Sequence, residues 1–116
     1  MKIGTREIGK GNPAYIIAEM SANHAGDIDR AKEIIHAAKE AGADCVKIQT
    51  YTPDTLTIDC DNSYFHISDG TWNGENLYQL YQKAYTPWEW QGELFEEAKK
   101  TGIDFFSTPV SYTHLR

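Results

Sequence analysis

One short pattern occurs twice in this chain and limits the folds that are open to it. The stretches "AKEAGADCVKI" from Ala38 and "AKKTGIDFFST" from Ala98 share Ala-Lys-x-x-Gly-x-Asp, followed by an apolar run. In each copy a helix is expected to end at the glycine, and a strand follows at once. Alternating strands and helices predict a parallel sheet with right-handed crossovers. The expected class is therefore α/β, as either a doubly wound sheet or a (β/α)8 barrel.

Apolar runs predict strands at residues 14–20, 44–51 and from Asp104 onward. The helix between the first two strands is expected to start at the N-cap Asp27 and to stop at Gly42. Its apolar stripe is expected to consist of Ile28, Ala31, Ile34, Ile35 and Ala38.

A second helix is predicted between the later two strands. Thr86, Pro87 and Glu89 belong to a Thr-Pro-Trp-Glu capping box, which places proline at the first helical position. Gly102 is the expected stop of this helix. The expected apolar stripe is Leu94, Phe95 and Ala98.

Charge and hydropathy narrow the classes of function. The chain has 116 residues and a formal net charge of -6, and its scattered Lys and Arg residues argue against nucleic-acid binding. No apolar run has the length of a signal peptide or a membrane span. We therefore expect a cytoplasmic protein without a nucleic-acid or membrane partner, and with reduced thiols at Cys45 and Cys60.

The segment from Thr52 to Tyr85 is an expected insertion after the second strand. The two copies of the repeated pattern lie about twice as far apart as one strand-helix unit of ~30 residues. Active sites of barrel enzymes lie at the C-terminal ends of the strands, so this insertion is a candidate for substrate recognition. An aromatic mini-core under a long loop is the alternative. The side chains concerned are Tyr64, Phe65, His66, Trp72, Asn73, Asn76, Tyr78 and Tyr81.

Lys47 and Gln49 occupy alternate positions near the end of the second predicted strand, "CVKIQTY". Both faces of a parallel sheet are normally covered, so these polar side chains need partners. Glu19 ends the first predicted strand, and in adjacent parallel strands it would meet Lys47 at the same rim. The pair is either a structural ion pair or part of a functional site.

Further polar side chains are expected at the same rim. The loop "MSANHAGD" after the first strand adds Ser21, Asn23 and His24, and the end of the third strand adds Ser107 and Thr108. A lone histidine is most often a hydrogen-bonded structural residue. Polar groups that converge from adjacent strand ends are instead typical of a site for an anion and a polyol.

Several of these stretches resemble the sialic acid synthase family, which condenses phosphoenolpyruvate with an amino sugar to make nonulosonic acids. They are "IIAEMSANHAGD", "AKEAGADCVKIQTYTPDTLT" and "FFSTP". The stretches "TYTPDTLTID", "FHISDGTW", "LYQLY" and "TPWEW" are more similar to the pseudaminic branch of that family than to its sialic or legionaminic branches.

The resemblance covers Ile3 to Pro109, about the first third of a family member. It implies that residues 1–109 are an N-terminal fragment, about three βα units, of a (β/α)8 TIM barrel. A small antifreeze-like domain and a domain-swapped homodimer are implied for the whole protein. The family continues Ser-Thr-Pro-Phe where this chain has Val110, so we expect residues 110–116 to be a non-native tail. A small non-catalytic α/β binding domain is the alternative from another class.

The resemblance also implies roles for individual residues. Glu19 matches the active-site glutamate of the family, Lys47 and Gln49 match its Lys-x-Gln pair, and Asn23 and His24 match its Asn-His loop. Lys47 would neutralise the enolpyruvyl anion, Gln49 would hydrogen-bond the sugar or the intermediate, and Glu19 would accept a proton or hold the attacking water. The remaining candidates for substrate binding are Tyr51, Tyr78, Ser107 and Thr108.

A divalent metal, Mn²⁺ or Mg²⁺, is implied as the Lewis acid that polarises the sugar aldehyde. The two metal-binding histidines of the family lie on later strands, so no metal ligand is expected in this chain. The histidines that do not match them are His24, His36, His66 and His114. The expected substrates are phosphoenolpyruvate and a 2,4-diacetamido-2,4,6-trideoxy hexose.

Overall fold

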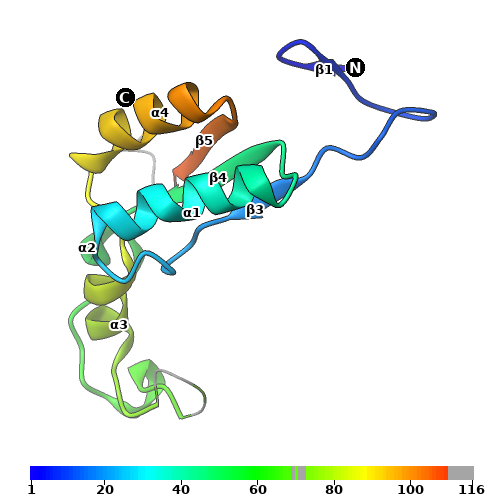
Figure 1. Ribbon diagram of the computed structural model, residues 1–116. Coiled ribbons are helices and arrows are strands. Elements are labelled where there is room, and N and C mark those ends of the chain that lie inside the picture. Colours follow the sequence, from blue (N-terminus) through cyan, green and yellow to red (C-terminus); the bar gives the residue numbers. More distant parts are fainter. Residues whose placement is uncertain (69, 71–72, 110–116) are drawn as a thin grey trace.

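The computed structural model describes residues 1–68, 70 and 73–109, and a parallel sheet lies at its centre (Figure 1). The sheet is three-stranded in the order β3-β4-β5, with β3 at Ile17–Glu19, β4 at Cys45–Thr50 and β5 at Asp104–Pro109. Helix α1 (Ile28–Glu40) connects β3 to β4, and α4 (Trp90–Thr101) precedes β5. The predicted α/β class and parallel pairing are confirmed. The tail expected at 110–116 lies outside the described residues.

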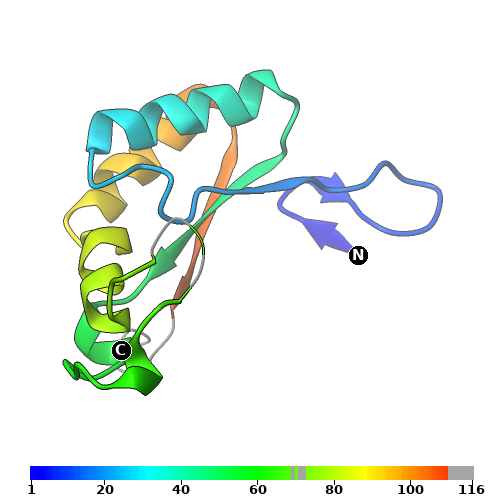
Figure 2. The same ribbon diagram turned by 90° about the horizontal axis from the view of Figure 1, so that it is seen from below.

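Helices α1 and α4 cover the same face of the sheet (Figure 2). The carboxylate of Asp27 caps α1 by accepting the N–H of Asp29 at 2.9 Å, and Gly42 follows the helix with a φ of 89°. Both ends of α1 are therefore as predicted. The core between the helices and the sheet consists of Met20, Ala31, Ile35, Ala38, Val46, Ile48, Leu94, Ala98 and Ile103.

The capping box predicted at Thr86 is wrong. Helix α4 starts at Trp90, after a turn in which the Trp90 N–H donates to the Pro87 carbonyl oxygen at 3.1 Å. Thr86 is buried, and its hydroxyl hydrogen-bonds His24 instead of a helical N–H. A partner distant in sequence has replaced the local cap.

The first strand is shorter than the predicted 14–20, and the placement of Phe95 in the apolar stripe of its helix is wrong. Strand β3 has only three residues, and its Ile17 is 44% exposed because β3 lies at the edge of the described sheet. Phe95 is 51% exposed, and it lines an apolar hollow together with Ile17 and Phe106. These side chains lie outside the core between sheet and helices.

The predicted insertion after β4 forms a separate projection at one end of the sheet (Figure 1). It contains α2 (Pro53–Leu56), a 3-10 turn (Ser63–Phe65) and α3 (Leu77–Ala84). Tyr51 is buried and packs edge-on against Tyr81, with ring centroids 5.7 Å apart, whereas Tyr64 is 90% exposed. An aromatic cluster thus anchors the projection but does not include all its aromatic residues. Trp72 lies outside the described residues.

A short antiparallel hairpin precedes the sheet (Figure 1), and its Arg6 pairs with Asp44 just before β4. Its strands are β1 (Lys2–Ile3) and β2 (Arg6–Glu7). Among the residues that the structure describes, none of the helices combines the length and apolar character that crossing a membrane requires.

Candidate functional site

The candidate site lies on the face of the sheet opposite α1 and α4, which we call the open face. The parallel register pairs Glu19 with Lys47, and Gln49 with Thr108. Side chains of paired residues point to the same face, and successive residues alternate between faces. The residues of β4 that alternate with Lys47 and Gln49 are buried against the helices. The structure therefore brings Glu19, Lys47, Gln49 and Thr108 to one face at the C-terminal end of the strands.

Glu19 and Lys47 form an ion pair between Oε1 and Nζ, as predicted from the strand ends. The Lys47 side chain is 22% exposed and that of Glu19 is 54% exposed. Solvated ion pairs of this kind contribute only about 0 to 1 kcal/mol to stability. The arrangement holds an ammonium group on the open face, where it is available to an anionic ligand.

Ser107 and Thr108 lie on opposite faces of β5. The Ser107 hydroxyl hydrogen-bonds the Thr50 hydroxyl, which also accepts from Nε2 of Gln91 in α4 at 2.9 Å. Ser107 thus belongs to the polar contacts beneath the helices, and the structure does not bring it to Lys47. Thr108 lies beside Gln49.

His24 is completely buried and both of its ring nitrogens are engaged within the chain. Nδ1 accepts the Gly26 N–H at 3.0 Å, so the proton of the neutral ring lies on Nε2, which donates to Oγ1 of Thr86 at 3.0 Å. The ring also meets Trp90 edge-on, with centroids 5.2 Å apart. His24 therefore joins the β3–α1 loop to the segment before α4, and the structure does not place it on the open face.

The other candidate in the β3–α1 loop, Asn23, is exposed. Its Nδ2 donates to the Met20 carbonyl oxygen at 2.8 Å, so the side chain folds back on its own turn. Two non-glycine residues of this loop have a left-handed backbone, with a φ of 49° at Ser21 and 51° at Ala25. Such strain is common in loops beside functional sites, and the sequence carried no signal for it.

The two tyrosine candidates belong to the base of the projection. Burial raises the pKa of Tyr51, whose ring packs on Tyr81. The Tyr78 hydroxyl donates to Oδ1 of Asp54 at 3.0 Å, and this hydrogen bond raises the pKa of Tyr78. Tyr78 therefore connects α3 to α2, and Tyr51 anchors α3 to the end of β4.

Two further described histidines, His36 and His66, each pair with one carboxylate. Nε2 of His36 lies 2.7 Å from Oε1 of Glu97, and Nε2 of His66 lies 2.6 Å from Oδ1 of Asp61. Within residues 1–68, 70 and 73–109, no group of three or more His, Cys, Asp or Glu side chains is arranged to hold a metal ion. His114 lies outside these ranges.

Acidification is expected to destabilise the full-length protein through His24. Burial lowers the pKa of His24 below its ordinary 6.5, so the folded state binds the proton less well than the unfolded state. The stability that the neutral ring provides is complete above pH 6.5 and is lost as the pH falls from there through the folded pKa. Thermal midpoints measured between about pH 8 and 5 test this expectation.

The matched variants for this experiment are His24→Gln and His36→Gln. The first should flatten the fall in midpoint below pH 6.5, and the second, at an exposed position on α1, should leave that fall in place. An equally steep fall in wild type and in His24→Gln would show that other groups govern the acid response.

The chain belongs to the NeuB family, which its residues 34–116 match. This confirms the resemblance to sialic acid synthases. Over 111 residues the chain is 50% identical to the pseudaminic acid synthase of Campylobacter jejuni serotype O:2, covering 96% of this chain and 32% of that protein. It is 54% identical over 99 residues to the pseudaminic acid synthase of Helicobacter pylori, covering 85% of this chain and 29% of that protein.

A solved structure shares the fold. The N-acetylneuraminic acid synthetase of Leptospira borgpetersenii, crystallised with citrate, superposes with a TM-score of 0.75 at 31% identity. The match covers 99% of this chain and 35% of that structure. The chain thus spans about a third of the length of the relatives it matches.

Proposed function

We propose that this chain is the N-terminal part of a pseudaminic acid synthase. The full enzyme condenses phosphoenolpyruvate with a 2,4-diacetamido-2,4,6-trideoxy hexose and releases a nonulosonic acid and phosphate. The observation that carries the proposal is that Glu19, Lys47 and Gln49 lie on one open face of the sheet. The chain that holds them is 50% identical to a pseudaminic acid synthase.

The sheet is proposed to form the first strands of a (β/α)8 barrel, with residues 1–109 as its N-terminal part. In such barrels the helices form an outer ring and the active site lies at the C-terminal ends of the strands. Two features support this assignment: α1 and α4 cover one face only, and Glu19 at the end of β3 pairs with Lys47 on the other face. The whole enzyme is further proposed to be a cytoplasmic homodimer.

In the proposed reaction, C3 of phosphoenolpyruvate forms a bond to the aldehyde carbon of the open-chain sugar. The π bond of the aldehyde opens onto its oxygen, which takes up a proton to become a hydroxyl group. Water adds to the oxocarbenium carbon left at C2, and the C–O bond to phosphate breaks. Lys47 neutralises the anionic enolpyruvyl group as its charge shifts. Glu19 accepts the proton of the attacking water or orients it, and Gln49 hydrogen-bonds the sugar or the tetrahedral intermediate.

A divalent metal, Mn²⁺ or Mg²⁺, is proposed for the full enzyme only. Its ligands are expected on later strands, and the described residues form no group of three or more metal-binding side chains that could hold it. No step of this proposal passes through a metal. The roles assigned above belong to Glu19, Lys47 and Gln49 of this chain.

Phosphate release by the full-length protein tests the proposal. With phosphoenolpyruvate present, we expect turnover with the 2,4-diacetamido-2,4,6-trideoxy hexose to exceed turnover with N-acetylmannosamine. A clear preference for N-acetylmannosamine would reject the pseudaminic assignment in favour of a sialic acid synthase. A preference for the legionaminic acid precursor would assign the chain to that branch.

A further inference from the structure

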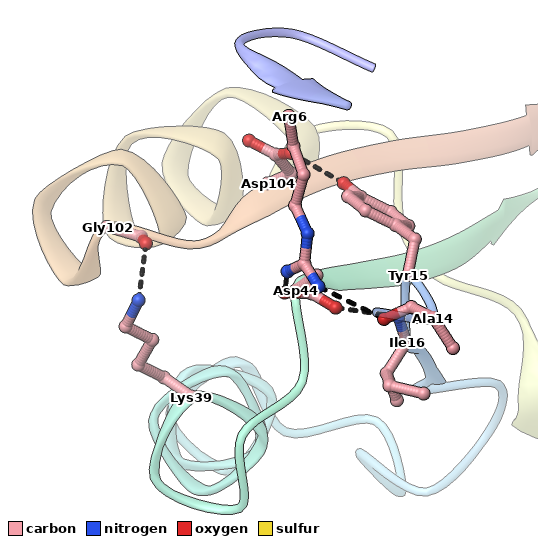
Figure 3. A network of polar contacts seen from close by, with 8 residues as sticks. All are labelled: Arg6, Ala14, Tyr15, Ile16, Lys39, Asp44, Gly102 and Asp104. Carbon is pink, nitrogen blue, oxygen red and sulfur yellow. Dashed lines mark hydrogen bonds and ion pairs between the residues drawn. The ribbon is translucent and has the colours of Figure 1, made fainter. Parts of the chain in front are cut away.

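Asp44 connects the first residues of all strands in the sheet, at the end away from the candidate site (Figure 3). Its Oδ2 accepts the Ile16 N–H at 2.7 Å, and its Oδ1 pairs with the guanidinium of Arg6. Its backbone N–H donates to the Ile16 carbonyl oxygen at 2.8 Å, and its own carbonyl oxygen accepts the Asp104 N–H at 3.1 Å. One residue therefore joins the starts of β3, β4 and β5.

Arg6 and Asp104 hold the segment before β3 from either side (Figure 3). Nη2 of Arg6 donates to the Ala14 carbonyl oxygen at 3.1 Å, and the guanidinium lies 5.7 Å from the centre of the Tyr15 ring. The Tyr15 hydroxyl donates to the Asp104 carboxylate. Asp44 and Asp104 are the aspartates of the repeated Gly-x-Asp pattern, so both copies of the pattern hold residues 14–16 in place.

Strand β3 is three residues long and mostly exposed, so its own side chains fix its position along β4 only weakly. The other contacts that hold the register lie at its far end, where the Met20 N–H donates to the Lys47 carbonyl oxygen at 2.9 Å and the Met20 side chain is buried. Because side chains alternate with a period of two, a slip of one residue would turn Glu19 to the helix-covered face. Ala18 would then stand opposite Lys47.

We propose that Asp44 is a positioning residue whose carboxylate sets the register of β3 on β4 and so places Glu19 opposite Lys47. Asp44 precedes Lys47 by roughly 10 Å along the strand and touches no substrate, so it acts through the backbone. The proposal rests on the proposed synthase function, which assigns the Glu19–Lys47 pair to the reaction. The proposal extends that function by a positioning residue at the opposite end of the strands from Glu19.

The test is a double-mutant cycle in the full-length enzyme. Asp44→Ala is expected to lower kcat about 10-fold or more, on the scale of a small misplacement of reacting groups. Asp44→Asn keeps an acceptor for the Ile16 N–H and should lose less activity. In a Glu19→Gln background Asp44→Ala should lower kcat by no more than about twofold, because the group it positions is already gone. If the kcat losses of Asp44→Ala and Glu19→Gln simply multiply in the double variant, the proposal is overturned.

Glu40→Ala is the matched control, because it removes a carboxylate at the exposed end of α1 without touching the Ile16 N–H or residues 14–16. Its effect on kcat should be the same with and without Glu19→Gln. If Asp44→Ala does not fold, Arg6→Gln removes the charge that orients the carboxylate and should show the same coupling to Glu19. Independent effects of Arg6→Gln and Glu19→Gln would then count against the proposal.

Amide hydrogen exchange separates this proposal from the proposed function. Asp44→Ala should accelerate exchange in residues 16–20 and leave the amides in the later half of β5 protected, whether or not the enzyme is active. If the wild-type protein releases no phosphate but Asp44→Ala still accelerates exchange, the synthase function is rejected and the register assignment is kept. Unchanged exchange across residues 16–20 would reject the register assignment itself.

Discussion

Replacing Lys47 by methionine in the full-length protein is expected to lower kcat/KM for phosphoenolpyruvate at least ~100-fold. Methionine keeps much of the apolar stem and removes the ammonium group. That group is held on the open face by its strand and by Glu19, so its interaction with a shifting negative charge needs no reorganisation. Steady-state assays of phosphate release over a range of phosphoenolpyruvate concentrations give the ratio directly.

Lys100→Met is the matched control for this variant, because Lys100 is an exposed residue in the last turn of α4. Its kcat/KM should stay close to that of the wild type. If Lys47→Met folds and keeps wild-type activity, Lys47 is only a structural partner of Glu19. A comparable loss in Lys100→Met would instead indicate a general effect of lowering the positive charge.

Leu94→Ala should lower the free energy of unfolding by about 2 to 5 kcal/mol. Leu94 is fully buried in the cluster that joins α4 to α1 and the sheet, so truncation removes apolar contacts and leaves a cavity. Urea titration of the full-length protein, followed by circular dichroism, measures the change. Activity below the transition should survive, since Leu94 lies on the helix-covered side of the sheet.

Glu96→Ala provides the comparison on the same helix, at an exposed position. A surface change of this type should alter stability by no more than about 0.5 kcal/mol. Equal effects of the two substitutions would mean that the core between α4 and the sheet contributes less than its burial indicates.

Short-range patterns in the chain were enough to predict most of the local elements and the class of the fold. The Asp27 cap and the glycine stops act within a few residues, so their effects can be read from the chain alone. Gly102, for example, follows α4 with a φ of 79°, as its position in the repeated pattern predicted. The Glu19–Lys47 pair was also predictable, because Glu19 ends its strand and Lys47 stands opposite it on the adjacent parallel strand.

The partner that each polar side chain binds, by contrast, depends on contacts between segments that are far apart in the sequence. Thr86 could cap a helix or bond His24, and each hydrogen bond contributes only about 1 kcal/mol, so packing around the buried ring selected the second. Ser107 and Thr108 are neighbours whose faces depend on the phase of β5 relative to β4, which no local rule fixes. The role of Asp44 was invisible for the same reason: its partners at Arg6 and Ile16 come close only once the strands are aligned.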